Sequence, residues 1–299
     1  MQYSHAIITG GCGFLGRQLV SALIAKDIQV ITLDRNPSGP DGCLHIPGDV
    51  TETIGQALSE LNSVPQAKRV LFHLAGLSDA AQCARELELT QQMNVDLVEF
   101  VMNTALASGI GCALLPSTGY VYGEDGTFTE ASPLEPASAY AQSKVAAETV
   151  FQQYNDRCKT VVARLSNVYG PDSSPNTVIG RLLAQVSSGD SLSVWSLAPI
   201  RDFIHIDDVI DGFIRLCETN GNTPILANLS TGHGTSIGEM VDLIAKKTGL
   251  FVDKEGKPGQ KASTMVLDNS HIRTLTNWTP KVIMDIGLND CIARVTVSR

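Results

Sequence analysis

The chain has 299 residues, of which 43% are hydrophobic and 18% charged, and its formal net charge is −9. This length suffices for one large domain or two smaller ones, and the composition excludes a disordered chain. The negative charge argues against a broad polyanion-binding surface, so we expect no nucleic-acid partner. No apolar run reaches membrane-spanning length and no secretory-type leader is visible, so we expect a cytoplasmic protein without a membrane contact.

The first half of the chain alternates short apolar runs with helix-like stretches. This alternation predicts a parallel sheet covered by helices on both faces, with ligands bound beyond the carboxyl ends of the strands. The expected strands are 4–9, 29–34, 69–75, 112–117 and 160–165, and the expected helices are 14–25, 80–108 (broken near its start) and 137–157.

The second half is less regular. A polar loop is expected over 171–180, and residues 203–217 are expected to form a strand and a helix that rejoin the first sheet. The remaining expectations are a helix near 178–188, strands at 192–195 and from 227, a turn over 231–234, a helix at 236–248 and a basic loop at 254–262.

A glycine loop follows the first apolar run. Three glycines are spaced as G-x-x-G-x-x-G, at Gly10, Gly13 and Gly16. Glycines allow a tight turn and a close approach to a pyrophosphate, and the N-terminus of the next helix offers unpaired N–H groups to that anion. The pattern predicts a dinucleotide site, and a plain tight turn is the alternative.

An acidic residue ends the second apolar run. Asp34 can accept hydrogen bonds from the ribose hydroxyls of an adenosine, and its charge repels a 2′-phosphate. This favours NAD over NADP, although Arg35 directly after it weakens the exclusion. The alternative is a simple turn-forming aspartate.

Tyr140 and Lys144 are one helical turn apart and therefore share a helix face. An ammonium there favours the phenolate, which would make Tyr140 a better proton acceptor, and Lys144 could also hold a ribose. Thr118 closes the preceding strand and places a hydroxyl at the same edge of the sheet. The alternative for the pair is a solvated helix face.

Together these features resemble the extended short-chain dehydrogenase/reductase family, and within it the NAD-dependent nucleotide-sugar epimerase/dehydratase group. UDP-sugar 4-epimerases are the nearest type, and the resemblance runs along nearly the whole chain. It implies NAD as cofactor and Thr118, Tyr140 and Lys144 as catalytic residues. The implied cofactor contacts, besides the catalytic pair, are Gly10, Gly13, Phe14, Leu15, Gly16, Asp34, Arg35, Asp49, Val50, Leu74, Ala75, Gly76 and Asn94.

The implied fold is a Rossmann doubly wound parallel sheet with a smaller, discontinuous α/β substrate-binding lobe. We expect the NAD-binding Rossmann domain to comprise residues 1–166 and 203–226. The nucleotide-sugar lobe is expected to comprise residues 167–202 and 227–299.

The resemblance extends to segments that bind the substrate in the family. Asn167 lies in a segment that resembles R-x-x-N-x-Y-G-P, in which the asparagine contacts the nucleotide sugar. Arg201 begins a segment that resembles R-D-x-x-H-V-x-D-V, in which the arginine binds the diphosphate with its planar set of donors. A structural ion pair of Arg201 with Asp207 or Asp208 is the alternative.

Other expected substrate contacts depart from the family's usual residues or have an alternative. Ser78 stands where 4-epimerases often have a lysine. Lys257 or Lys261 stands where many members have an arginine for the diphosphate, and a lysine lacks the bidentate fork. Trp195 occupies the place of an aromatic residue near the base, with core packing as the alternative.

Two positions bear on the reaction. Related 4,6-dehydratases carry Asp-Glu where this chain has Gly119 and Tyr120, and neither residue can act as that carboxylate pair. The resemblance therefore implies 4-epimerisation of a UDP-sugar through a transient keto intermediate. The alternatives are an NAD(H)-dependent nucleotide-sugar ketoreductase or dehydrogenase, and a non-catalytic NAD-sensing protein on the same fold.

The scattered cysteines and histidines carry no chemistry of their own. The seven cysteines and six histidines lack the close spacing of a zinc site, and no H-E-x-x-H motif occurs. We expect no metal and no disulfide framework. Helices 80–108 and 137–157 are the surfaces through which the family usually forms homodimers, so a homodimer is expected.

Overall fold

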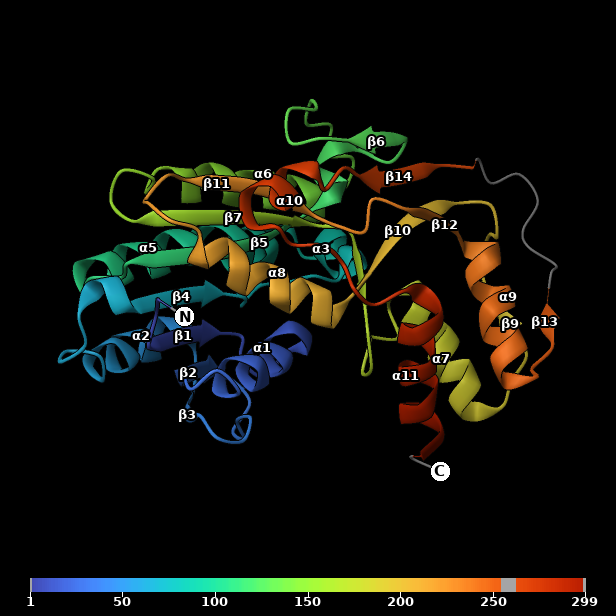
Figure 1. Ribbon diagram of the computed structural model, residues 1–299, viewed down its shortest axis with the longest axis horizontal. Coiled ribbons are helices and arrows are strands. Elements are labelled where there is room, and N and C mark those ends of the chain that lie inside the picture. Colours follow the sequence, from blue (N-terminus) through green and yellow to red (C-terminus); the bar gives the residue numbers. More distant parts are fainter. Residues whose placement is uncertain (1, 254–261, 298–299) are drawn as a thin grey trace. The chain divides into compact units, whose positions relative to one another are not determined.

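The computed structural model describes residues 2–253 and 262–297 and divides into two compact units (Figure 1). The first unit comprises residues 1–121, 133–164 and 210–227. The second comprises residues 122–132, 165–209 and 228–299. None of the helices in the described part of the chain combines the length and apolarity that a bilayer crossing requires.

A seven-stranded sheet forms the centre of the first unit. Its strands lie in the order β3-β2-β1-β4-β5-β7-β11, and the neighbouring strands from β3 to β5 pair in parallel. The order reverses between β1 and β4, which creates the switch point at which ligands bind in such sheets. The strands are β1 (His5–Thr9), β2 (Gln29–Asp34), β3 (Leu44–Pro47), β4 (Arg69–His73), β5 (Cys112–Thr118), β7 (Lys159–Leu165) and β11 (Ile225–Leu229).

The central strands are buried on both faces because helices cover both. All residues of β4 and β7 are buried, and Ile7 of β1 is paired with Ile31 and Leu71 in register. One face shares a core with α2, α5 and α6, and α1 and α8 cover the other (Figure 1). The expected Rossmann class is confirmed.

The helices of this region are α1 (Phe14–Ile24), α2 (Val50–Ser59), α3 (Ala80–Arg85), α4 (Leu87–Gln91), α5 (Leu97–Ala107), α6 (Ala139–Gln152) and α8 (Ile206–Glu218), with 3₁₀ turns η1 (Gln66–Lys68) and η3 (Gly119–Tyr122) and a π-helical segment η2 (Gln92–Asp96). The helix expected over 80–108 is thus broken near its start, as predicted. Glu86 leaves helical geometry with φ −123° and ψ 63°, which separates α3 from α4.

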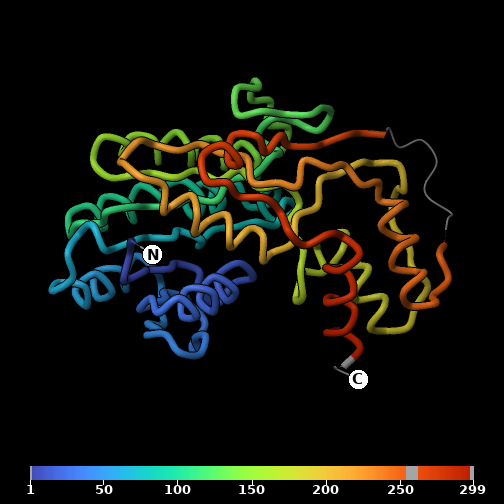
Figure 2. Tube along the Cα trace, viewed as in Figure 1, coloured from blue at the N-terminus to red at the C-terminus, as the bar shows by residue number. Residues whose placement is uncertain are grey.

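The second unit contains a five-stranded sheet of mixed direction. Its path is β12-β10-β14-β6, and β8 pairs with β10. Figure 2 shows β6 beside β14, although the two strands are far apart in the sequence. The strands are β6 (Gly126–Phe128), β8 (Asn167–Tyr169), β10 (Ile200–His205), β12 (Gly234–Ser236) and β14 (Thr264–Leu267), with a separate pair, β9 (Leu192–Ser193) and β13 (Val252–Asp253).

Helices α7 (Val178–Ser188), α9 (Ile237–Thr248), α10 (Ser270–Thr276) and α11 (Met284–Val297) complete this unit. Thr177 caps the start of α7, and Ser236 and Glu239 form a capping box at the start of α9. Both helices end at a left-handed glycine, Gly189 and Gly249. These start and stop residues explain why both helices were predicted close to their observed bounds.

One expected connection is wrong. The strand expected near 203 is β10, and it pairs with β8, β12 and β14 rather than with the first sheet. The strand that joins the first sheet is β11, after α8. The observed units therefore place residues 203–209 and 122–132 in the second unit, which differs from the expected domain boundaries. The cofactor and substrate roles of the two domains stay predictions.

Candidate active site

The three predicted catalytic side chains come together in the first unit. Thr118 ends β5, and Tyr140 and Lys144 lie in the first two turns of α6. Thr118 and Tyr140 are joined by a side-chain hydrogen bond. Lys144 Nζ lies 6.0 Å from the centroid of the Tyr140 ring and donates to the carbonyl oxygen of Pro116 at 3.1 Å.

Local sequence explains why α6 presents this pair. The Ser138 hydroxyl caps the helix by accepting a hydrogen bond from the N–H of Ala141 at 3.1 Å, so Tyr140 lies in the first turn. Pro116 lies within β5, two residues before Thr118, and its carbonyl receives the Lys144 ammonium. The hydroxyl, the phenol and the ammonium are thereby held between one strand end and one helix.

Burial dominates the protonation of this group. Burial raises the pKa of Tyr140 above its ordinary value, and the hydrogen bond with Thr118 acts in the opposite direction. Burial lowers the pKa of Lys144 to about 8, while the nearby charge of Glu148 works against that decrease. For Tyr140, burial outweighs the lowering by Thr118, and the expectation that Lys144 lowers this pKa stays a prediction.

The glycine loop is packed so closely that two of its positions require glycine. Gly10 has φ +71°, and a Cβ there would lie 2.8 Å from the backbone nitrogen of Ala75. A Cβ on Gly16 would lie 2.3 Å from the carbonyl oxygen of Gly10. The loop thus presses the start of α1 against its own turn and against the chain after β4.

The start of α1 suits an anion. Its N-cap is Gly13, which is exposed and supplies no capping side chain to the first-turn N–H groups, those of Phe14 and Leu15 among them. The first turn also contains no acidic residue. A helix start built in this way at the switch point fits the pyrophosphate of a dinucleotide.

Asp34 ends β2 beside this loop. Its Oδ2 accepts from the N–H of Cys12 at 3.0 Å, and its Oδ1 accepts from the N–H of Asn36 at 3.0 Å. The carboxylate therefore both orders the glycine loop and forms a local turn, as the alternative reading of Asp34 expected. It remains partly exposed, and Arg35 is exposed. Contact of either residue with a ribose stays a prediction.

The structure gives several other predicted cofactor residues a structural partner. Asp49 caps α2 by accepting from the N–H of Thr51 at 3.0 Å, which lowers the pKa of its carboxyl, and Val50 is buried in the core. After β4, the Thr9 hydroxyl accepts from the N–H of Ala75 at 3.2 Å, while the carbonyl of Thr9 accepts from the N–H of Leu74.

Asn94 connects the loop after β4 to the catalytic helix. Its Oδ1 accepts from the N–H of Leu77 at 2.7 Å, and its Nδ2 donates to the carbonyl of Leu77 at 3.0 Å and to the Ser143 hydroxyl at 2.9 Å. A Cβ on Gly76 would lie 2.9 Å from Asn94 Oδ1. Asn94 lies in the π-helical segment η2 and is 3% exposed, so its amide positions the loop around the site.

Sequence reasoning missed two groups beside the site. His73 is buried, its Nδ1 lies 2.7 Å from the Thr9 hydroxyl, and its Nε2 has no hydrogen-bond partner among the described residues. Burial lowers the pKa of this imidazole to about 3, so it is neutral at pH 7. Glu148 was missed too, although its spacing of four residues from Lys144 is a signal that the sequence contains.

The expected substrate residues are divided between the two units, and two of them lie outside the described residues. Ser78 is exposed and precedes α3 in the first unit. Asn167 belongs to the second unit, where its Nδ2 donates to the carbonyl of Asp202 at 3.2 Å. Trp195, in the same unit, is 56% exposed, so the core-packing alternative is wrong. Lys257 and Lys261 lie outside the described residues.

Arg201 is held by neighbours other than those expected. Its Nη1 donates to the carbonyl of Ser263 at 2.9 Å, and its Nη2 lies 3.8 Å from Glu124 Oε2. Asp207 approaches His205 instead, and Asp208 accepts from two backbone N–H groups, those of Lys281 and Val282. The alternative pairing of Arg201 with either aspartate is therefore wrong.

Comparison with known proteins identifies the family. The model of the NAD dependent epimerase/dehydratase family matches residues 6–229. The chain belongs to this family. The match includes the glycine loop, Asp34 and the Thr118–Tyr140–Lys144 group, and it confirms the resemblance seen in the motifs and an NAD-dependent enzyme class.

Related proteins cover almost the whole chain. The mouse dTDP-D-glucose 4,6-dehydratase is 27% identical over 96% of this chain and 87% of its own length. The UDP-glucose 4-epimerase of Mycolicibacterium smegmatis is 27% identical over 95% of this chain and 96% of its own. A solved UDP-glucose 4-epimerase from Thermotoga maritima, with UDP-glucose, superposes with a TM-score of 0.87 at 24% identity, covering 98% and 99% of the two chains. This last likeness supports the fold.

Proposed function

We propose that the protein is an NAD-dependent nucleotide-sugar 4-epimerase that acts on a UDP-sugar. The observation that carries the proposal is the contact of Thr118, Tyr140 and Lys144 at the end of β5, in the same unit as the glycine loop. A phenol, a hydroxyl and an ammonium that lie close together suit proton exchange with a sugar alcohol.

In the proposed reaction, Tyr140 first releases its phenol proton to solvent and then, as the phenolate, accepts the proton of the C4 hydroxyl, while the Thr118 hydroxyl donates a hydrogen bond to the developing oxyanion. When bound, NAD supplies a positively charged ring that accepts the C4 hydride and later returns it. Lys144 Nζ lies 6.0 Å from the centroid of the Tyr140 ring, and a positive charge there would favour the phenolate. After the ketosugar turns, Tyr140 gives the proton back, so the cycle is redox-neutral.

The helix start at Gly13 and the loop packing at Gly10 and Gly16 support the placement of NAD in the first unit. Phe14 and Leu15 would supply N–H groups to the pyrophosphate, and Asp34 would accept from the adenosine ribose. In the second unit, Arg201 and Asn167 would bind the nucleotide diphosphate and the sugar. Trp195 presents an exposed ring that could stack on the base.

The choice of epimerase over dehydratase depends on the residues after Thr118. A 4,6-dehydration needs an acid and a base to remove a proton at C5 and a hydroxyl at C6. Gly119 and Tyr120 begin the 3₁₀ turn η3 at this point and supply no carboxylate. Simple oxidation and re-reduction at C4 therefore suits this chain better.

The direct test is interconversion of UDP-glucose with UDP-galactose, and of their N-acetylamino counterparts, followed by NMR in the presence of NAD. Turnover without net consumption of NAD supports the epimerase. Stoichiometric oxidation of NADH with a keto-sugar substrate would instead identify the ketoreductase, a reaction type suggested by the 26% identical dTDP-6-deoxy-L-talose 4-dehydrogenase of Kitasatospora kifunensis. Binding of NAD without turnover of any nucleotide sugar would favour a sensing protein.

We further propose a cytoplasmic homodimer formed through α5 and α6. Phe100 of α5 is 41% exposed, and a second copy would cover such an apolar ring. Sedimentation of the wild type and of Phe100→Ser tests the dimer, because the polar substitution should shift the population towards monomer.

A further inference from the structure

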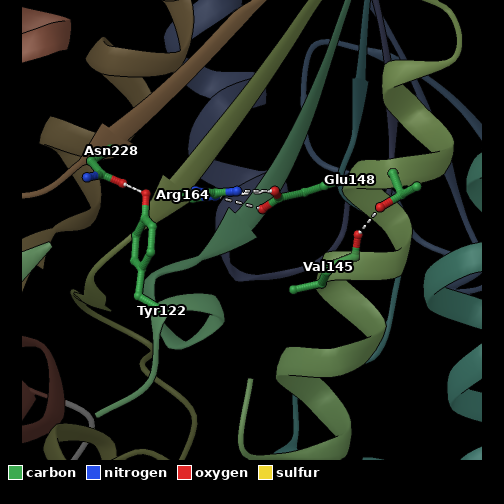
Figure 3. Close-up of polar contacts among 6 residues, drawn as sticks. Tyr122, Val145, Glu148, Arg164 and Asn228 are labelled. Atoms are coloured by element: carbon green, nitrogen blue, oxygen red, sulfur yellow. Dashed lines mark hydrogen bonds and ion pairs between the residues drawn. The ribbon is translucent and has the colours of Figure 1, made fainter. Parts of the chain in front are cut away.

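A buried ion pair lies one turn beyond Lys144 on α6 (Figure 3). Arg164 Nε lies 3.0 Å from Glu148 Oε1 and 3.2 Å from Oε2, and Arg164 Nη2 lies 2.6 Å from Oε2. The two side chains are 4% and 3% exposed. The contact is bidentate and connects the catalytic helix to β7.

Stability alone does not account for this pair. Removing a carboxylate and a guanidinium from water is costly, and well-packed apolar residues often stabilise a protein as much or more. The pair stands beside a third charge, because Lys144 lies four residues before Glu148 on the same helix face. Glu148 therefore pairs directly with Arg164, and its charge also acts on Lys144, whose pKa it raises against the effect of burial.

We propose that Glu148 and Arg164 are positioning residues that set the charge of Lys144. Glu148 favours the protonated, ammonium form of Lys144, and Arg164 limits how strongly Glu148 does so. The inference deepens the proposed function, since turnover depends on Lys144 only if Tyr140 and Lys144 act as proposed. The charge of Lys144 can be measured whether or not that function is correct.

The groups around Lys144 agree with this arrangement. Burial lowers the pKa of Lys144, and the charge of Glu148 is the largest opposing effect, followed by the Cys83 thiol of α3. His73 of β4 is neutral at pH 7 because burial lowers the pKa of its ring to about 3. Tyr140 is neutral too, because burial raises the pKa of its phenol. Among these neighbours, Glu148 is therefore the residue whose formal negative charge acts on the Lys144 ammonium.

Substituting Glu148 and substituting Arg164 should shift the pKa of Lys144 in opposite directions. Glu148→Gln removes the negative charge that acts on Lys144 and leaves Arg164 without its partner, so the pKa of Lys144 should fall further. Arg164→Gln leaves the carboxylate of Glu148 without its guanidinium, so the pKa of Lys144 should rise. Each variant breaks the same ion pair, so each serves as the structural control for the other.

The experiment is an NMR titration of the full-length protein with bound NAD, labelled with ¹³C-lysine. The Lys144 signal is assigned by its loss in Lys144→Arg. We expect the midpoint to fall by about one pH unit in Glu148→Gln and to rise by about one unit in Arg164→Gln, a tenfold change in the protonation equilibrium each way. Equal midpoints, or shifts in the same direction, would overturn the proposal.

A double variant covers the case in which a single variant does not fold. Glu148→Met with Arg164→Met replaces both charges by apolar side chains, which buried ion pairs commonly tolerate. Because Glu148 is the member whose charge acts on Lys144, the midpoint should still fall, by less than in Glu148→Gln. An unchanged midpoint in a folded double variant would contradict the inference.

Turnover separates this inference from the proposed function. If the inference and the function both hold, the alkaline limb of the epimerisation rate moves with the NMR midpoint, downward in Glu148→Gln and upward in Arg164→Gln. If the midpoints move and the rate profile does not, the pair sets the charge as proposed and the role of Lys144 in turnover is wrong.

Discussion

The two units of this protein use buried polar side chains for different ends. In the second unit, the buried carboxylate of Asp202 accepts from the N–H and hydroxyl of Thr231 and from the N–H of Gly232. Asp208 likewise holds the chain at Lys281. Burial raises the pKa of Asp202, and these hydrogen bonds act against that increase. In the first unit, burial displaces the pKa values of two neighbouring groups, Tyr140 and Lys144, that serve no backbone turn in this way.

This contrast indicates a division of labour. Carboxylates saturated by backbone N–H groups order loops, whereas a phenol and an ammonium with displaced pKa values are suited to proton transfer. Changes in the first unit should therefore alter the chemical step or cofactor binding, and changes at the exposed groups of the second unit should alter substrate affinity.

The largest effect is expected from Tyr140→Phe, which removes the proposed base without changing the size of the ring. Turnover should fall by about 10²- to 10⁴-fold, the usual contribution of general acid–base catalysis, while NAD affinity stays within about twofold. The measurement is kcat by NMR, with NAD binding by calorimetry. Tyr154→Phe is the matched control, because Tyr154 is a buried tyrosine away from Thr118 and Lys144. Surviving activity in Tyr140→Phe would show that another group is the base.

Gly16→Ala should come next. Its Cβ would lie 2.3 Å from the carbonyl of Gly10, so the start of α1 must move away from the loop. We expect NAD affinity to fall by about 100-fold, because pyrophosphate binding at a helix start depends on that close fit. Gly55→Ala is the control: no atom lies within 4 Å of the added Cβ in α2, and affinity should not change. Normal NAD binding by Gly16→Ala would place the pyrophosphate elsewhere.

Arg201→Lys tests the second unit. The substitution keeps the charge and loses the planar fork, so KM for the UDP-sugar should rise about tenfold with little change in kcat. Steady-state kinetics measure both values, and Arg215→Lys, in the ion pair with Asp211, should change neither. A fall in kcat at unchanged KM would contradict the division between the units.

The smallest effect concerns pH. The pKa of Lys144 is lowered to about 8, so its ammonium is present below that pH and is lost as the pH rises through it. Turnover should therefore decline above about pH 8 in the wild type. Lys144→Arg keeps its charge at higher pH, so its residual turnover should lack this decline. An identical alkaline limb in both proteins would assign it to another group.

The sequence predicts some parts of the fold and the site better than others. The glycine loop, the β1 and β2 strands and the Tyr140–Lys144 pair were predictable because their spacing is local and continuous apolar runs mark the buried strands. β3 and α2 were missed, since β3 has only four residues and α2 is half polar. The start of α2 is marked by the Asp49 cap, which the motif comparison assigned to the cofactor.

Long-range pairings were harder to predict. Nothing local distinguishes a strand that enters the first sheet from one that pairs with three-residue strands elsewhere, so β10 was assigned to the wrong sheet. The contacts of Asn94 with Leu77 and Ser143 join three separate segments, and the Glu148–Arg164 pair joins α6 to β7. Such partners become visible only when the chain is folded.

The π-helical segment has a consequence for the length of the chain around it. A π turn contains one residue more than the α-helical turn that it replaces, and each residue of an α-helix rotates the side chains that follow by about 100°. Deleting one residue from 92–96 would restore regular winding and swing the Asn94 amide off Leu77. The loop that carries Gly76 would then lose its hydrogen bonds through Asn94 to the helix that carries Tyr140. The extra residue of the π turn therefore fixes the rotation at which Asn94 faces both the loop and α6.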